Sequence, residues 1–217
     1  LRDGLLAELS LRGAWPRTLV RQVERSALAV ARQYGVDQSH ARHVARLAEQ
    51  LFDALQEAHQ LDERYRMMLR TATILHDIGL FISNQSHHKH SMYLIRNSQV
   101  FGLGQHELLL VALIARYHRR AMPKPTHEGY ADLARGDRLV VLKLASILRV
   151  ADALDRTRRQ RVRRIECEQD GEQLVLTLPD VADVTLEQMA LEQKGPMFER
   201  TYGMTVVLRG GAADAGA

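Results

Sequence analysis

Residues 73–79, Thr-Ile-Leu-His-Asp-Ile-Gly, end an apolar helical stretch with a histidine directly before an aspartate. His76 and Asp77 offer one imidazole and one carboxylate from a single turn of chain. That pair suits a divalent cation of intermediate hardness, such as Mn, Fe, Ni, Zn or Mg. Taken alone, the pair has a second interpretation, in which His76 binds the last carbonyl groups of its helix and interacts favourably with the helix dipole.

The chain on both sides of this stretch has the apolar spacing of α-helices. Pro16 suits the first position of a helix that Gly35 ends, and Asp62 suits the N-cap of a helix that stops at Gly79. We expect further helices at about 38–59, 88–98, 105–119 and 137–157, and a loop at 122–126.

The hydrophobic pattern changes after about residue 160. Residues 165–168 and 174–178 read as short strands around a turn, followed by a helix at 184–194 and a strand at 205–208. The sequence therefore predicts a mainly α protein with a small C-terminal α+β subdomain. The expected divisions are an N-terminal extension (1–15), a helical domain (16–160), a small β-β-α-β subdomain (161–210) and a disordered tail (211–217).

Charge is distributed unevenly along the chain. The net charge is +4, but residues 1–165 carry +11 and the last 52 residues carry −7. The basic charge of residues 1–165 favours polyanionic partners such as polyphosphate, nucleotides or nucleic acid. Aromatic residues make up only 5%, which disfavours binding of a single nucleic-acid strand by stacking.

The single cysteine excludes an intrachain disulfide. No apolar run is long enough to span a bilayer, so we expect no membrane partner and a cytoplasmic location.

Six arginines fall within residues 156–164. One interpretation is a track for polyphosphate or nucleic acid, because planar guanidinium groups suit phosphate. The other is an exposed helix end and linker that docks on the acidic C-terminal piece.

Two further helices carry polar groups on their apolar faces. At 3.6 residues per turn, the mean direction of the apolar stripe on helix 38–59 lies about 50° from His40 and about 110° from His43. His40 therefore leans towards the core, where it needs a metal or a backbone carbonyl as partner. Asp152 and Asp155 both lie within the stripe of helix 137–157, and a buried aspartate needs a cation or an arginine. Helical geometry does not choose between these two aspartates.

The order His40, His76-Asp77, Asp152 resembles the HD superfamily of metal-dependent phosphohydrolases. This resemblance selects His40 over His43 and Asp152 over Asp155. A closer similarity is to the C-terminal region of the exopolyphosphatase/guanosine pentaphosphate phosphohydrolase family. It is carried by four stretches, namely residues 76–83, 87–98, 114–119 and 144–156.

The resemblance implies an HD-type helical domain in which His40, His76, Asp77 and Asp152 hold a divalent cation, and His90 and His118 hold a second one. The lysine that often follows the His-Asp-x-Gly turn is replaced here by Leu80. In the family, hydrolysis belongs to two N-terminal actin-like domains, which this chain lacks. Those domains and a second copy of the chain, in a homodimer, are the expected protein partners.

The first expected function is a metal-binding domain that handles polyphosphate or a phosphorylated nucleotide. The alternatives are an autonomous metal-dependent phosphohydrolase and a non-catalytic polyanion-binding and dimerisation module. If the site is catalytic, the cation lowers the pKa of a bound water and Asp77 orients that water. Candidate phosphate-binding residues, each with a solvated helix face as the alternative, are Lys89, Arg119, Lys143 and Arg149.

Overall fold

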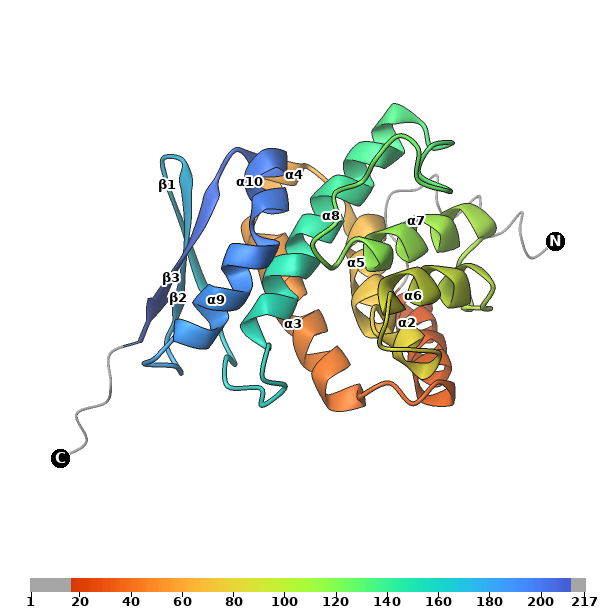
Figure 1. Ribbon diagram of the computed structural model, residues 1–217, viewed down its shortest axis with the longest axis horizontal. Helices are drawn as coiled ribbons and strands as arrows, with labels where there is room; N and C mark the ends of the chain where they lie inside the picture. Colours follow the sequence, from red (N-terminus) through yellow and green to blue (C-terminus); the bar gives the residue numbers. More distant parts are fainter. Residues whose placement is uncertain (1–16, 212–217) are drawn as a thin grey trace.

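The computed structural model describes residues 17–211. The expected extension at 1–15, the helix start at Pro16 and all but the first residue of the expected tail lie outside these described residues. Within them, helices form most of the structure and a three-stranded sheet lies near the C-terminal end (Figure 1). The predicted fold class, mainly α with a small C-terminal α+β part, is confirmed.

The first part of the chain folds into helices that pack around α8 and α5. In order they are α2 (Arg17–Gln33), α3 (Gln38–Ala54), α4 (Gln56–His59), α5 (Glu63–Leu75), the 3₁₀ helix η1 (Ile78–Phe81), α6 (His87–Arg96), α7 (Gln105–Arg116) and α8 (Arg135–Leu154). Helix α8 contacts α3, α5 and α7 on one side and the C-terminal part on the other. It therefore lies at the centre of the molecule (Figure 1).

Side-chain caps set two helix starts as the sequence predicts. Asp37 accepts hydrogen bonds from the backbone N–H groups of Ser39 and His40, and Asp62 caps α5 in the same way. Two ends differ from the prediction. The expected helix 38–59 is interrupted after Ala54, and the helix expected to reach Gly79 ends at Leu75 and tightens into η1.

The C-terminal part contains β1 (Glu166–Asp170), β2 (Gln173–Leu178), α9 (Thr185–Lys194), α10 (Pro196–Tyr202) and β3 (Thr205–Gly210). Strand β2 pairs antiparallel with β1 and parallel with β3. The predicted β-β-α-β order is wrong by one helix. Helix α10 was not expected; it begins with Pro196 at its first position and buries Phe198 in the core.

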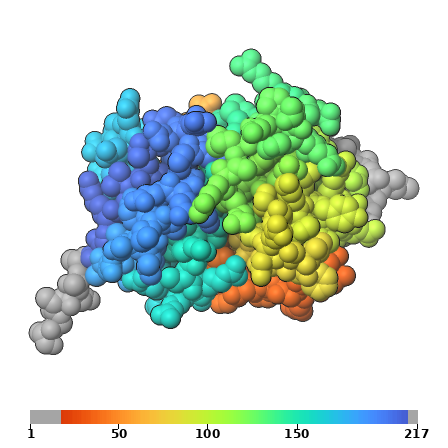
Figure 2. Space-filling view, viewed as in Figure 1, coloured from red at the N-terminus to blue at the C-terminus, as the bar shows by residue number. Residues whose placement is uncertain are grey.

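One continuous hydrophobic cluster joins the two parts. It runs from Val23 in α2 to Leu208 in β3. Helices α9 and α10 both contact α8, and α10 also contacts β3. Figure 2 shows the C-terminal part, in blue, meeting the green and yellow helical segments along one face. Among the described residues, no helix has the length and apolar character needed to cross a membrane.

Candidate metal centre

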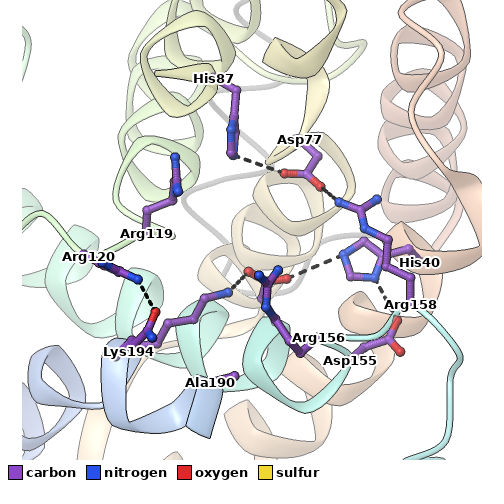
Figure 3. A pocket seen from close by; sticks show the side chains of 12 residues that line it. His40, Asp77, His87, Arg119, Arg120, Asp155, Arg156, Arg158, Ala190 and Lys194 are labelled. Carbon is purple, nitrogen blue, oxygen red and sulfur yellow. Dashed lines mark hydrogen bonds and ion pairs between the residues drawn. The ribbon is translucent and has the colours of Figure 1, made fainter. Parts of the chain in front are cut away.

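Five parts of the helical fold bring polar side chains together in and beside one cavity, which lies between the two parts of the molecule (Figure 3). The side chains come from the start of α3, the end of α5, the first turn of α6, the end of α7 and the last turn of α8. They are His40, His76, Asp77, His87, His118 and Asp152. Residues far apart in the sequence therefore converge on one site.

Asp77 is the centre of this cluster. Its Oδ1 lies 3.6 Å from Nε2 of His76, 3.6 Å from Nε2 of His87 and 3.9 Å from Nε2 of His118. The Oδ1 atom of Asp152 lies 3.5 Å from Nε2 of His40 and 3.8 Å from Nε2 of His76.

The geometry defines two overlapping donor groups that could hold a metal ion. One consists of His40, His76 and Asp77, and the other of Asp77, His87 and His118; in each, the ligand atoms lie within 4.8 Å of one another. The carboxylate of Asp77 belongs to both groups. If each group held an ion, the carboxylate of Asp77 would be a ligand common to both.

Each of the four imidazoles is oriented through Nδ1, which contacts an oxygen atom. The acceptors are Asp155 Oδ2 for His40 (2.7 Å), the Thr73 carbonyl for His76 (2.6 Å), the Asn84 carbonyl for His87 (3.3 Å) and the Ala115 carbonyl for His118 (2.6 Å). A proton on Nδ1 leaves the Nε2 lone pair for another partner. Metal-binding histidines in proteins are usually held in this way.

The donor set fits a divalent cation. The Nε2 atoms of His76 and His40 are buried, and neither has a hydrogen-bond partner among the described residues. A buried polar atom without a partner costs free energy, and the neighbouring carboxylate oxygens lie too far away for a good hydrogen bond. A cation between the imidazoles and carboxylates would satisfy both kinds of donor.

The pKa shifts favour ionised carboxylates. Burial raises the pKa of Asp77, but electrostatic interactions with the His76 and His118 imidazoles and with the Arg158 guanidinium group outweigh burial and hold that pKa well below its usual range. Burial likewise opposes ionisation of Asp152, and the ammonium group of Lys194 is the largest influence that keeps its pKa low. Both carboxylates are therefore charged at neutral pH.

The histidines divide into two classes. Burial holds the pKa of His118 well below its ordinary value and also lowers the pKa of His87. Burial lowers the pKa of His40 as well, but the carboxylates of Asp152 and Asp155 outweigh it and raise that pKa to about 9. His118 is thus neutral and ready to ligate, whereas His40 must lose a proton when a cation binds.

Basic side chains surround the cluster. Arg158 donates to Oδ2 of Asp77, and Lys194 donates to Oδ2 of Asp152. Arg119, Arg120 and Arg156 also line the cavity. Among the described residues that line it, five are basic, apart from histidine, and three are acidic. The cavity is therefore cationic before any metal is added.

The structure places His87, rather than His90, in the second donor group. His87 begins α6, so its side chain extends back towards Asp77, while His90 belongs to neither group. The two histidines are one helical turn apart, and sequence spacing alone could not separate them. His43 is also buried, but its Nδ1 lies 3.1 Å from Arg46 and it belongs to neither donor group.

Of the four residues expected to bind phosphate, only Arg119 lines the cavity. Lys89 lines a separate hollow together with Tyr93 and Arg96 of α6. Lys143 instead donates to the backbone carbonyl of His59 at 2.8 Å.

Arg149 has a structural role in place of the expected phosphate contact. Its side chain is 1% exposed, and its guanidinium group donates to the carbonyl groups of Tyr117 and Ala121, each at 2.6 Å. These carbonyls lie just beyond the end of α7, so Arg149 satisfies them from α8.

The arginine run supports parts of both interpretations. Arg156 and Arg158 line the cavity. Arg161 instead reaches the acidic C-terminal part, where it lies 3.5 Å from Glu187 and donates to the carbonyl of Asp183. Loop residues after a helix have no periodicity, so the sequence could not show which arginines turn inwards.

Comparison with known proteins gives a match over most of the chain. Residues 20–195 match the family model described as Ppx/GppA phosphatase, domain III. Guanosine-5'-triphosphate,3'-diphosphate pyrophosphatase of Aeromonas hydrophila is 35% identical over 159 residues, covering 72% of this chain and 31% of that protein. The protein of the same name from Pseudoalteromonas translucida is 32% identical over 120 residues, covering 55% of this chain and 23% of that protein.

A third protein with this name, from Aeromonas salmonicida, is 31% identical over 158 residues. That similarity covers 72% of this chain and 31% of the relative. The chain thus spans about a third or less of the length of the curated relatives it matches.

Proposed function

Because the chain belongs to the Ppx/GppA phosphatase family, as its domain III, we propose that it contains a divalent-metal centre that binds phosphate groups. The substrate class is polyphosphate or a phosphorylated nucleotide. Relatives named as guanosine-5'-triphosphate,3'-diphosphate pyrophosphatases support the nucleotide, and the cationic cavity suits either polyanion. Actin-like domains preceding this one are the proposed partners within a longer protein.

The observation that carries the proposal is the pair of buried Nε2 atoms, on His40 and His76, that face ionised carboxylates and have no hydrogen-bond partner among the described residues. His40, His76, Asp77 and Asp152 would hold one cation. Asp77, His87 and His118 would hold a second. A bound divalent cation attracts phosphate oxygens and lowers the pKa of a coordinated water molecule.

Phosphate recognition follows from charge. The cavity lining carries an excess of basic over acidic side chains, and a divalent cation would add to it. Arg119 and Arg156 form no ion pair with any described residue, so their guanidinium groups are available for a bound anion. Charge-assisted hydrogen bonds from guanidinium to phosphate are the strong kind, and they are frequently bidentate.

Metal analysis of the purified chain tests the proposal directly. We expect bound transition metal or Mg²⁺, and calorimetric titration with Mn²⁺ should give saturable binding that His76→Ala abolishes. His106→Ala is the matched control, because His106 is exposed and pairs with Asp137 away from the cavity. Wild-type protein that binds no divalent cation would contradict the proposal.

A second function, hydrolysis by this domain alone, is favoured by the room beside Asp77. The cavity encloses about 160 Å³, enough for a phosphate group and several water molecules. Asp77 could accept a hydrogen bond from a water and orient it, while Arg119 and Arg156 hold the phosphate oxygens. Release of inorganic phosphate from a nucleotide or polyphosphate by the isolated chain, lost in His76→Ala, would establish this activity.

A further inference from the structure

The two carboxylates of the candidate metal centre present their oxygens to different partners. Oδ1 of Asp77 and Oδ1 of Asp152 face histidine Nε2 atoms at 3.5–3.9 Å. Oδ2 of Asp77 accepts from Arg158, and Oδ2 of Asp152 accepts from Lys194 (Figure 3). Each carboxylate thus lies between imidazoles on one side and a cationic side chain on the other.

These contacts neutralise the site when no metal is bound. Two ionised carboxylates in one buried cluster repel each other, and the charge of Asp152 opposes ionisation of Asp77. Arg158 and Lys194 together bring two positive charges, which equals the charge of one divalent cation. They therefore supply the positive charge that a cation would supply, and they leave the Oδ1 atoms of both aspartates and the histidine Nε2 atoms unused.

Entry of a cation changes this balance. A positive charge at the Oδ1 atoms of the two aspartates repels the guanidinium group of Arg158 and the ammonium group of Lys194. It also weakens the attraction of the aspartate Oδ2 atoms for these groups. Arg158 is able to move, because its side chain is 42% exposed and it lies in the loop after α8. Lys194 ends α9 and is 17% exposed at its side chain.

Both side chains keep unused donors at the same cavity. Arg158 donates to Asp77 only from Nη2, while its Nη1 lies 3.9 Å from Asp37. The Nζ of Lys194 has three donors and uses one of them on Asp152 among the described residues. Arg119 and Arg156 line the same space. A phosphate bound there would meet all four cations.

We propose that Arg158 and Lys194 exchange partners: they neutralise Asp77 and Asp152 in the metal-free site, and they bind substrate phosphate once a divalent cation is held. The inference rests on the proposed metal centre. It assigns phosphate binding to two residues outside the histidine–aspartate motif. One of them, from α9, makes the C-terminal part a direct contributor to the site.

The exchange predicts effects of opposite sign in one variant. Arg158→Gln removes a cation that opposes metal entry, so its affinity for Mn²⁺ should rise by about fivefold. The same variant, saturated with Mn²⁺, should bind inorganic tripolyphosphate about tenfold more weakly, because a charge-assisted contact is lost. Calorimetric titration with the metal alone, and then with tripolyphosphate, measures both quantities. Lys194→Gln should show the same pair of changes.

Two matched variants separate the exchange from a general charge effect. Arg159→Gln removes the same charge one residue further on, at an exposed side chain that does not line the cavity, and should change neither affinity by more than about twofold. Arg158→Lys keeps the positive charge but removes the planar guanidinium group and its paired N–H donors. We expect wild-type metal affinity and intermediate tripolyphosphate affinity from it.

Each other outcome has a definite meaning. If folded Arg158→Gln and Lys194→Gln, checked by circular dichroism, bind Mn²⁺ no more tightly than wild type, the exchange is wrong and these residues only orient the carboxylates. Unchanged tripolyphosphate affinity would overturn the phosphate role. Wild-type protein that binds no divalent cation overturns the metal centre itself, and the exchange with it.

Discussion

His40 donates from Nδ1 to Oδ2 of Asp155 at 2.7 Å, although the two residues are 115 positions apart in the chain. Asp155 follows α8 and also accepts from the backbone N–H of Gln160. The contact ties the start of α3 to the end of α8 and fixes the imidazole with its Nε2 towards Asp152. Asp155 is thus placed to orient a ligand without being one.

Removal of Asp155 should therefore weaken metal binding. In Asp155→Ala the His40 ring loses the acceptor that fixes its orientation, and we expect about 10- to 100-fold lower affinity for Mn²⁺ by calorimetric titration. Asp155→Asn should lie between, since its amide oxygen can still accept from Nδ1. Asp132→Asn, at an exposed site outside the cavity, serves as the control. Wild-type affinity in Asp155→Ala would show that the contact does not orient the ligand.

The stability of the metal-free protein should depend on pH through His40. Its pKa is about 9 in the folded protein, because the carboxylates of Asp152 and Asp155 outweigh burial, and about 6.5 in an unfolded chain. A raised pKa contributes stability that is complete below pH 6.5 and is lost as the pH rises through 9. In EDTA, the melting temperature of wild type should fall by roughly 5 °C between pH 6.5 and 9.5 through this group.

His40→Gln provides the comparison for this pH effect. The variant should have a flatter melting profile over pH 6.5–9.5, while changes from Cys167, whose pKa burial raises to about 11, remain in both proteins. Histidines with lowered pKa values, such as His118, act below pH 6.5 and in the opposite sense. Parallel profiles for wild type and His40→Gln would argue against the raised pKa.

The periodic parts of the fold were predictable from sequence, and so was much of the cluster. Helical phase favours His40 over His43, and the structure directs His40 into the cavity. Helical geometry did not choose between Asp152 and Asp155, and both lie at the site. Asp152 faces Nε2 of His40, whereas Asp155 binds Nδ1 of the same ring, so the two residues have different roles. Each of these residues lies on or at the end of a long helix, where burial follows from a regular repeat.

Residues without a periodic context were not predictable. Arg158 lies in a loop and has a left-handed backbone conformation, and Lys194 reaches the cavity only because α9 packs on α8. Helix α10 is short, and its seven residues are too few to show a clear helical repeat in the sequence. These features depend on tertiary packing, which a single sequence does not encode in a local pattern.

Gly79 should be essential to the turn that follows His76. A Cβ atom at this position would overlap the backbone of His87 and Ser91 in α6. The Ser91 hydroxyl also accepts from the N–H of Gly79 at 2.9 Å and donates to the carbonyl of His76 at 2.6 Å. We expect Gly79→Ala to destabilise the protein by about 3 kcal/mol in urea unfolding and to weaken metal binding.

Gly136→Ala is the matched control for this substitution. Gly136 lies in the first turn of α8, and a Cβ there would have nothing within 4 Å among the described residues. Alanine favours helix over glycine, so this variant should keep or gain up to about 1 kcal/mol. Equal stability of the two alanine variants would show that η1 and α6 can separate without cost.

Metal removal should lower the melting temperature, because the ligands come from helices that are distant in sequence. His40 lies in the first turn of α3, His76 and Asp77 follow α5, and Asp152 lies in α8, so a cation would hold three helices together. At a free metal concentration 100 times the dissociation constant, binding stabilises the folded state by about 2.7 kcal/mol. For a domain of this size, that corresponds to about 5–10 °C between metal-loaded and EDTA-treated protein in differential scanning calorimetry. His76→Ala should show no such difference, while His106→Ala should behave as wild type. A wild-type melting temperature that is insensitive to both Mn²⁺ and EDTA would mean that no ion bridges these helices.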